Sequence, residues 1–200
     1  MKPPLSASLT VLRAACSLGV VCVLAGCEDP GPVAAPDPSS SARVSAAVAP
    51  GPSLFTARPL AEAIGKLEQH IGGPVRALEL QVHADHLLLQ AQDPKQPGNV
   101  DEYELHDGTL LDPVPVKLHG PGKLDDNLFP LHEARLDAIP GLVDAALAEL
   151  GIEKAKVTHV RIKRNLPLSD DVQVRVFVSG LRKDGYVDAD KDGKIIATSE

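Results

Sequence analysis

The 200-residue chain contains the same order of elements twice, an amphipathic helix, a glycine and a series of strands, and this order restricts its fold more than any other feature. In residues 54–118, apolar side chains recur at helical spacing from Pro59 to Ile71, and two glycines follow. Leu78, Leu80 and Val82 then alternate with polar residues, so we predict that they share the buried side of a strand. The predicted strands of this part are 75–83, 86–92, 100–106 and 109–116.

The order returns in residues 132–200. A helical apolar face runs from Ile139 to Leu150, with Pro140 in its first turn and Gly151 after its end. Strands are predicted at 157–164 and 172–179, and a last hairpin at 185–198. A half of about 60 residues is small for a domain that must form a hydrophobic core of its own. We therefore predict an α+β fold in which two helix-then-antiparallel-strand repeats pack as one unit, joined by the link 119–131.

The N-terminal residues 1–26 have the features of a secretory signal peptide, with early positive charge followed by an apolar run. The run ends at Leu24-Ala25-Gly26-Cys27, which resembles the lipobox of bacterial lipoproteins, and that resemblance implies lipidation of Cys27. An ordinary signal peptide with an incidental Cys is the alternative. Residues 27–53 are mostly Pro, Ala, Ser and Gly, so we predict a disordered tether.

Cysteine usage and charge limit the possible functions. The chain has three cysteines, and processing at Cys27 would leave no free thiol for a disulfide, a metal site or a nucleophile. The formal net charge is −7, and the predicted signal peptide would remove only cations, so nucleic acid is not an expected partner. The chain has no Trp, two Tyr and three Phe, which supplies few rings for stacking on sugars or bases.

The hairpin "YVDADKDGKII" contains Asp188, Asp190, Asp192 and Gly193 in the spacing that opens a calcium loop. The position of the closing bidentate Glu holds Ser199, and the flanking residues favour strands. The corresponding "YELHDGTLL" of the first half keeps only the Asp-Gly pair, a signature of tight hairpin turns. We interpret the segment as an acidic hairpin and keep calcium binding as the alternative.

A second candidate metal site is the pair His83 and His86. If Ala84-Asp85 forms a two-residue turn, the two imidazoles face each other; if the chain stays extended, they point to opposite faces. A closed zinc site needs four ligands, so Asp85 or His106 would have to complete it. Histidines exposed at a turn are the other interpretation.

Three cations, Arg161, Lys163 and Arg175, are predicted on the outward phase of adjacent strands in the second half. Such a basic patch could dock an acidic partner or a cell-wall anion. The simpler interpretation is a solvated face whose cations discourage aggregation.

The helix that ends in glycine and the hairpin from Tyr186 to Ile196 resemble PepSY domains and beta-lactamase-inhibitor-protein-like folds. That resemblance implies protein binding or inhibition.

Motifs of nucleophilic, phosphate-binding or zinc-dependent enzymes do not occur in the sequence, so we do not expect an enzyme. We predict a lipid-anchored periplasmic lipoprotein, in the inner or the outer membrane, that binds an unidentified envelope protein. The alternatives are a calcium- or metal-binding accessory protein and a small hydrolase.

Overall fold

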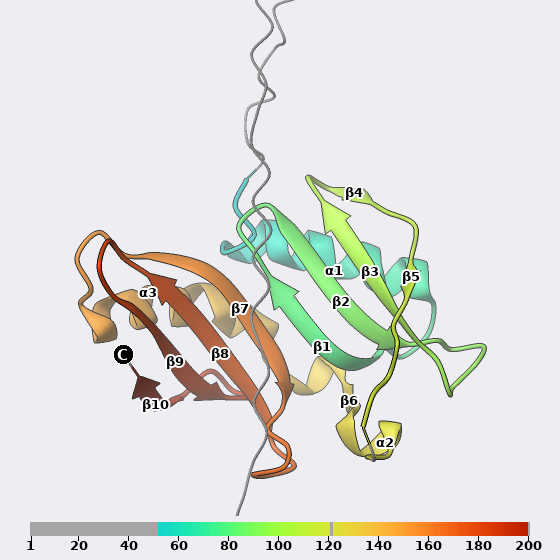
Figure 1. The fold of residues 1–200 in the computed structure, drawn as a ribbon. Helices are drawn as coiled ribbons and strands as arrows, with labels where there is room; N and C mark the ends of the chain where they lie inside the picture. The colour runs from blue at the N-terminus through green and yellow to red at the C-terminus, as the bar shows by residue number, and fades with distance from the viewer. Residues whose placement is uncertain (1–51, 121, 200) are drawn as a thin grey trace, which may run out of the picture. The chain divides into compact units, whose positions relative to one another are not determined.

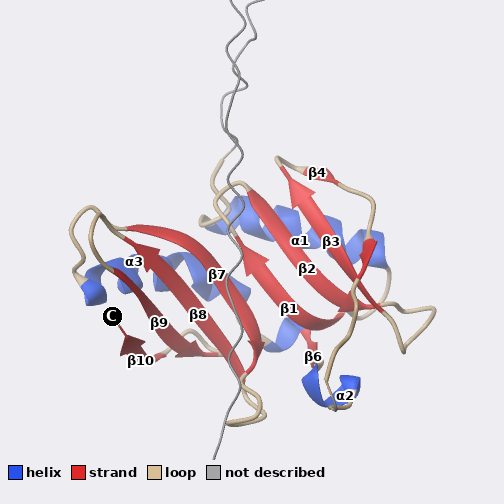
Figure 2. Ribbon diagram, viewed as in Figure 1, coloured by secondary structure: helices blue, strands red, loops and turns tan. Residues whose placement is uncertain are grey.

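The structure is a computed structural model that describes residues 52–120 and 122–199. The predicted signal peptide, Cys27 and nearly all of the predicted tether lie outside the described residues. In the part of the chain that is described, no helix combines the length and the apolar character needed to cross a membrane. The fold consists of helices and one antiparallel sheet, as predicted (Figure 1; Figure 2).

The first half contains one long helix followed by strands. Its elements are α1 (Ala57–Ile71), β1 (Arg76–Val82), β2 (His86–Gln92), β3 (Val100–His106), β4 (Thr109–Leu110) and β5 (Val114–Pro115). Helix α1 ends where predicted, because Gly72 takes a positive φ of 76° and donates its N–H to the carbonyl of Glu68 at 3.0 Å. The predicted strand at 109–116 is instead two short strands, β4 and β5, and each of them pairs with β3.

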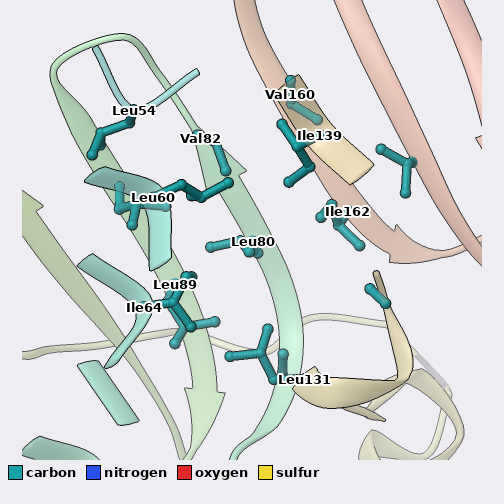
Figure 3. Close-up of a cluster of buried hydrophobic side chains, with 14 of the residues drawn as sticks. Leu54, Leu60, Ile64, Leu80, Val82, Leu89, Leu131, Ile139, Val160 and Ile162 are labelled. Atoms are coloured by element: carbon teal, nitrogen blue, oxygen red, sulfur yellow. The ribbon is translucent and has the colours of Figure 1, made fainter. Parts of the chain in front are cut away.

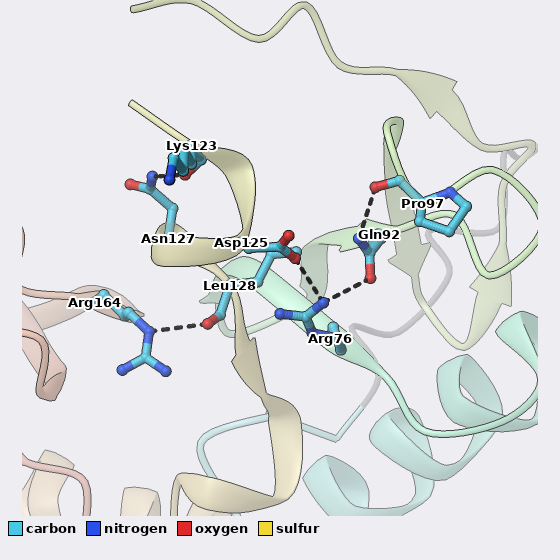
Figure 4. A network of polar contacts seen from close by, with 8 residues as sticks. All are labelled: Arg76, Gln92, Pro97, Lys123, Asp125, Asn127, Leu128 and Arg164. Atoms are coloured by element: carbon cyan, nitrogen blue, oxygen red, sulfur yellow. Dashed lines mark hydrogen bonds and ion pairs between the residues drawn. The ribbon is translucent and has the colours of Figure 1, made fainter. Parts of the chain in front are cut away.

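The segment between β5 and α3, which includes the link 119–131, is structured in its described residues and contributes to the core. It contains α2 (Leu124–Asn127), β6 (Phe129–Pro130) and the two 3₁₀ turns η1 (Leu131–Glu133) and η2 (Leu136–Ala138). Phe129 is fully buried where β6 pairs with β1. Figure 4 shows how polar contacts fasten this segment: Arg76 Nη1 lies 2.8 Å from Asp125 Oδ1, and Arg164 Nε donates to the Leu128 carbonyl at 2.9 Å.

The second half has a similar content, with α3 (Ile139–Leu150), β7 (Lys156–Arg164), β8 (Val172–Ser179), β9 (Asp184–Asp190) and β10 (Ile195–Ser199). Helix α3 covers the predicted residues and ends at Gly151, which is left-handed with φ 57° and ψ 24°. In β8, every second residue from Val172 to Val178 is buried, as the alternation predicted.

The strands form one sheet in the order β10-β9-β8-β7-β1-β2-β3-β4. The halves meet where β1 and β7, the first strands after their helices, pair antiparallel with Leu80 opposite Ile162 and Val82 opposite Val160. In the view of Figure 1, α1 and α3 lie behind the strands. Both helices therefore cover the same face of the sheet, as expected for an α+β fold.

One continuous core lies between the helices and the sheet. It includes the buried face of α1, the buried face of α3 and the inward residues of the central strands. Figure 3 shows Leu80 and Val82 of β1 beside Val160 and Ile162 of β7, and all four side chains are fully buried. Burial of each such side chain contributes about 1.5–3 kcal/mol, so the junction between β1 and β7 is a central part of the core.

The prediction for Leu78 is wrong. The register of β1 against β2 shifts between Ala77 and Glu79, which places a bulge at Leu78. Ala77 is fully buried instead, and Leu78 is only partly buried. A bulge reverses the alternation of side chains, and simple period-two counting does not detect it.

Candidate interaction surface

The candidate site is the sheet face that α1 and α3 do not cover. It carries the outward residues of β1 to β3 and of β7 to β9, which are mostly charged, polar or aromatic. In Figure 1 this is the face turned toward the viewer. These side chains are partly buried by one another, as in His159 and Phe177, while the alternate residues of the same strands are buried in the core. Antiparallel sheets commonly keep one face for the core and one for solvent or a partner.

Six rings cross this face in a continuous line, which we call the ring row: His106, His86, His83, His159, Phe177 and Tyr186. The centroids of His106 and His86 lie 5.4 Å apart, and those of His86 and His83 lie 4.0 Å apart. The His83–His159 distance is 5.2 Å and the His159–Phe177 distance is 4.2 Å. All four contacts are stacked, with interplanar angles of 11° to 18°. Tyr186 follows at 6.3 Å in a tilted arrangement.

Strand register is what aligns the row. His86 lies directly opposite His106, His159 opposite Phe177, and Phe177 opposite Tyr186. His83 and His86 flank the turn between β1 and β2, where the His83 N–H donates to the His86 carbonyl at 2.9 Å. Side chains directly opposite one another in antiparallel strands are about 5 Å apart, which is the spacing that ring stacking needs.

Two arginines lie against the aromatic end of the row. The guanidinium of Arg175 is 4.0 Å from the ring centroid of Tyr186, and that of Arg161 is 5.0 Å from the centroid of Phe177. Arg175 also forms a two-pronged ion pair with Asp188, at 2.6 Å from Nε to Oδ1 and 2.9 Å from Nη2 to Oδ2. The Asp188 carboxylate is buried, and its hydrogen bond raises the pKa of Arg175 above its ordinary value. Arg175 is thus held rigidly among rings.

The histidines in the middle of the row are poor proton acceptors. Burial, followed by the nearby imidazoles of His86 and His159, lowers the pKa of His83. Burial and the charge of Arg161 lower the pKa of His159. His83 Nε2 is buried, and among the described residues it has no hydrogen-bond partner. Both imidazoles are therefore held in the neutral form at neutral pH.

The three predicted cations lie on this face. Arg161 is directly opposite Arg175, and Lys163 is opposite Gln173 and exposed. Arg175 differs from the other two because its charge is already compensated by Asp188. Binding of a partner by these residues stays a prediction.

The three aspartates of the predicted calcium loop each contact other groups. Asp188 is paired with Arg175, and Asp192 lies 2.8 Å from Lys191 Nζ. Asp190 Oδ1 accepts the backbone N–H groups of Asp192 and Lys194 at 3.0 and 2.9 Å, which shapes the turn before β10. A calcium ion would have to displace these partners before the carboxylates could converge on it.

His83 and His86 do face each other across the two-residue turn. Their rings are stacked at 11°, so the lone pairs of their nitrogens, which lie in the ring planes, run side by side and do not converge. Asp85 Oδ1 lies 2.7 Å from His86 Nδ1. Within residues 52–120 and 122–199, no three His, Cys, Asp or Glu side chains are placed to hold a metal ion together.

Sequence reasoning missed the ring row. The available signal was that His83, His159, Phe177 and Tyr186 all occupy outward positions of predicted strands. The order of the strands was needed as well, because the pairing of β1 with β7 brings His83 to His159 across 76 residues of sequence. That pairing could not be read from either half alone.

Comparison of the chain with family models, with curated proteins and with solved structures found no match. The resemblance to lipoproteins, PepSY domains and beta-lactamase-inhibitor-protein-like folds therefore rests on the residues of this sequence alone.

Proposed function

We propose that this chain is a lipid-anchored protein of the bacterial envelope whose α+β domain binds another protein through its open sheet face, without chemistry of its own. The observation that carries the proposal is the ring row with Arg161 and Arg175 beside it. Aromatic side chains and arginines are the residues that most often dominate the energy of protein interfaces.

The anchor is proposed from Leu24-Ala25-Gly26-Cys27 and from the Pro-, Ala- and Ser-rich segment after it. A lipid on Cys27 and an extended tether would hold the sheet face away from the membrane while leaving it free to meet a partner. Glu28 and Asp29 follow the cysteine, and acids at this place retain some lipoproteins in the inner membrane, so either membrane remains open.

We further infer that the two halves are copies of one helix-then-strands unit. The inference is supported by the order α1 to β3 and α3 to β9, by the glycines that end both helices, and by the Asp-Gly turns at 107–108 and 192–193. A pair of such units gives a wide sheet face from a short chain.

Lipidation is tested by feeding cells an alkyne-tagged palmitate and detecting its incorporation into the full chain. The tag should label the protein, and Cys27→Ser should abolish the label. A labelled Cys27→Ser chain, or an unlabelled parent chain, would remove the anchor from the proposal.

Partner binding is tested with a photo-crosslinking amino acid placed at Arg161 or Lys163 of the full chain in cells. The control position is Glu149, which is exposed on α3 on the helix side of the sheet. We expect a defined crosslinked protein from the first two positions and none from Glu149. The same products from all three positions, or no product from Arg161 and Lys163, would contradict the open face as the binding surface.

A charge reversal adds to this test. The double variant Arg161→Glu and Lys163→Glu should lose the crosslink that is formed from a third position, Gln81, on β1 opposite Arg161. Arg175 is left intact, because its replacement would leave Asp188 buried and unpaired and would disturb folding.

A further inference from the structure

Four of the six rings in the row are imidazoles that touch one another in sequence, from His106 through His86 and His83 to His159. Imidazole is the side chain whose charge changes between about pH 5 and pH 8. Because each ring lies within 5.4 Å of the next, a proton on one raises the cost of a proton on its neighbours. Such a row takes up charge in steps over a broad pH range.

The charges beside the row differ between its two ends. Carboxylates surround the first-half end: Asp85 lies 2.7 Å from His86 Nδ1, Glu104 lies 3.5 Å from His106 Nδ1, and Asp107 lies 3.6 Å from His106 Nε2. The hydrogen bond from His86 holds the pKa of Asp85 below its usual range, so this carboxylate stays ionised in mild acid. The first-half end is therefore anionic when its imidazoles are neutral.

At the second-half end of the row, the charge nearest to the rings that no ion pair among the described residues compensates is positive. The charged and titratable groups that face the imidazoles from all packed elements are Glu79, Asp85, Glu104, Asp107, Arg161, Arg175, Tyr186 and Asp188. Arg175 and Asp188 compensate each other, which leaves Arg161 as the cation nearest to the stacked rings. At neutral pH an acidic partner would be attracted to one end of the row and repelled at the other.

We propose that the four stacked imidazoles make the open sheet face acid-responsive, so that it binds an acidic polypeptide more tightly at mildly acidic pH than at neutral pH. Protons on His86 and His106 offset the charges of Asp85, Glu104 and Asp107, which lie beside these two rings. The repulsion of an acidic partner at the first-half end then decreases, while Arg161 attracts it at the other end. The partner is assigned as acidic because charge complementarity improves only for that class when the imidazoles are protonated.

This inference rests on the proposed function, since it assigns the chemistry of the partner and the regulation of the same face. It adds a role for the imidazoles that the arginine and aromatic end does not require. The row is thus a control element placed across the binding surface.

The first measurement needs no partner. The four row histidines are followed by NMR of the isotope-labelled full chain in detergent from about pH 8 to pH 4.5. We expect His159→Phe to raise the pKa of His83, because burial and the neighbouring imidazoles lower that pKa and the variant removes one of these imidazoles. A His83 curve that is unchanged by His159→Phe would overturn the coupling within the row.

The second measurement uses a short fluorescent peptide of Asp and Gly, which keeps its charge between about pH 5.5 and pH 7.5 because Asp titrates near 3.9. The full chain should bind this peptide roughly tenfold more tightly at the lower pH, which corresponds to a shift of about one pKa unit on binding. The double variant His86→Phe and His106→Phe, at the two imidazoles beside the carboxylates, should lose most of that difference while keeping ring stacking. Retention of the full difference by this variant would overturn the proposal.

A matched control removes two imidazoles that lie outside the row. His119 and His132 are both exposed, and the variant His119→Gln with His132→Gln should keep the pH response of the parent chain. An equal loss in this control would show that the response comes from overall charge and would overturn the role of the row. If His86→Phe with His106→Phe fails to unfold cooperatively, the pair His86→Gln and His106→Gln takes its place.

The two proposals fail separately. The peptide reports the charge of the face without a natural partner, so a flat pH response overturns the acid-responsive row even if crosslinking identifies a partner. A pH-responsive face that yields no crosslinked protein in cells overturns the proposed function and leaves the charge behaviour of the row established.

Discussion

The two halves of the sheet are alike on the inside and different on the outside. Inward residues of β1 to β3 and of β7 to β9 are mostly Leu, Val and Ala in both halves and share one core. Outward residues of the first half are chiefly carboxylates, amides and histidines, whereas those of the second half include Arg161, Lys163, Arg175, Phe177 and Tyr186. Packing thus requires one pattern from both halves, while the free face can carry a different function at each end.

The hairpins that close the halves differ in the same way. Asp107-Gly108 forms a tight turn before β4, and its Asp107 N–H donates to the Asp85 carbonyl at 3.1 Å. The turn before β10 is longer and is held from inside by Asp190, while the Arg135 N–H donates to the Lys191 carbonyl at 2.8 Å. The acidic segment therefore forms a turn that contacts the residues just before α3.

The largest expected effect comes from removing the ring that the link inserts into the core. Phe129→Ala should lower the free energy of unfolding by about 3–5 kcal/mol, because the side chain is fully buried beside β1. Leu118→Ala, at a side chain that is 43% exposed, is the control and should cost less than about 0.5 kcal/mol. Urea unfolding measures both. Separate transitions for the halves in Phe129→Ala, instead of one shifted transition, would show that the halves are independent.

The next comparison sets an ion pair of the second half against one of the first. Arg175→Met should cost about 3 kcal/mol, because it leaves the Asp188 carboxylate buried without its partner. Arg76→Met should cost less than about 1 kcal/mol, because the Asp125 side chain is 73% exposed. Equal losses in urea unfolding would contradict the view that the second half holds its outward charges more rigidly.

The glycines of the closing turns give a smaller contrast. Gly108 and Gly193 both have positive φ, at 75° and 85°, so alanine is strained at either position. An added Cβ at Gly193 would lie 2.8 Å from Ala138 Cβ, whereas at Gly108 the nearest atom is the flexible Lys66 Nζ at 3.5 Å. We expect a loss of about 2 kcal/mol for Gly193→Ala and about 1 kcal/mol for Gly108→Ala in thermal unfolding. A larger loss for Gly108→Ala would contradict the docking of the longer turn.

The smallest expected effect is on the pH dependence of stability. The pKa values of His83 and His159 are lowered in the folded protein, so below the ordinary value of about 6.5 the unfolded chain binds more protons. The free energy of unfolding should therefore fall as the pH decreases from about 7 and level off below the folded pKa values. Urea midpoints measured across this range should flatten in His83→Phe with His159→Phe. A rise in stability on acidification that depends on these residues would contradict the lowered pKa values.

The local parts of the fold were predictable, and the parts that depend on pairing were not. Periodicity located α3 and β8 to the residue, because Pro140, Gly151 and the valines of β8 act through their own neighbourhood. The bulge at Leu78 depends on the register with β2, and the burial of Phe129 depends on space beside β1. The sequence indicated that Arg161, Lys163 and Arg175 share a face, but the ring row needs five strand pairings at once.

The antiparallel pairing of β1 with β7 has a consequence for symmetry. Each strand is the first after its helix, and two equivalent strands that run in opposite directions are related locally by a two-fold axis perpendicular to the sheet. Such an axis is the one that relates two subunits in an isologous homodimer. If the halves are copies, a single half would expose the edge of its first strand and could restore the continuous sheet by joining a second identical half. The chain would then be the covalent equivalent of such a homodimer. Because the link joins both halves in one chain, the outward residues of one half could change independently of those of the other.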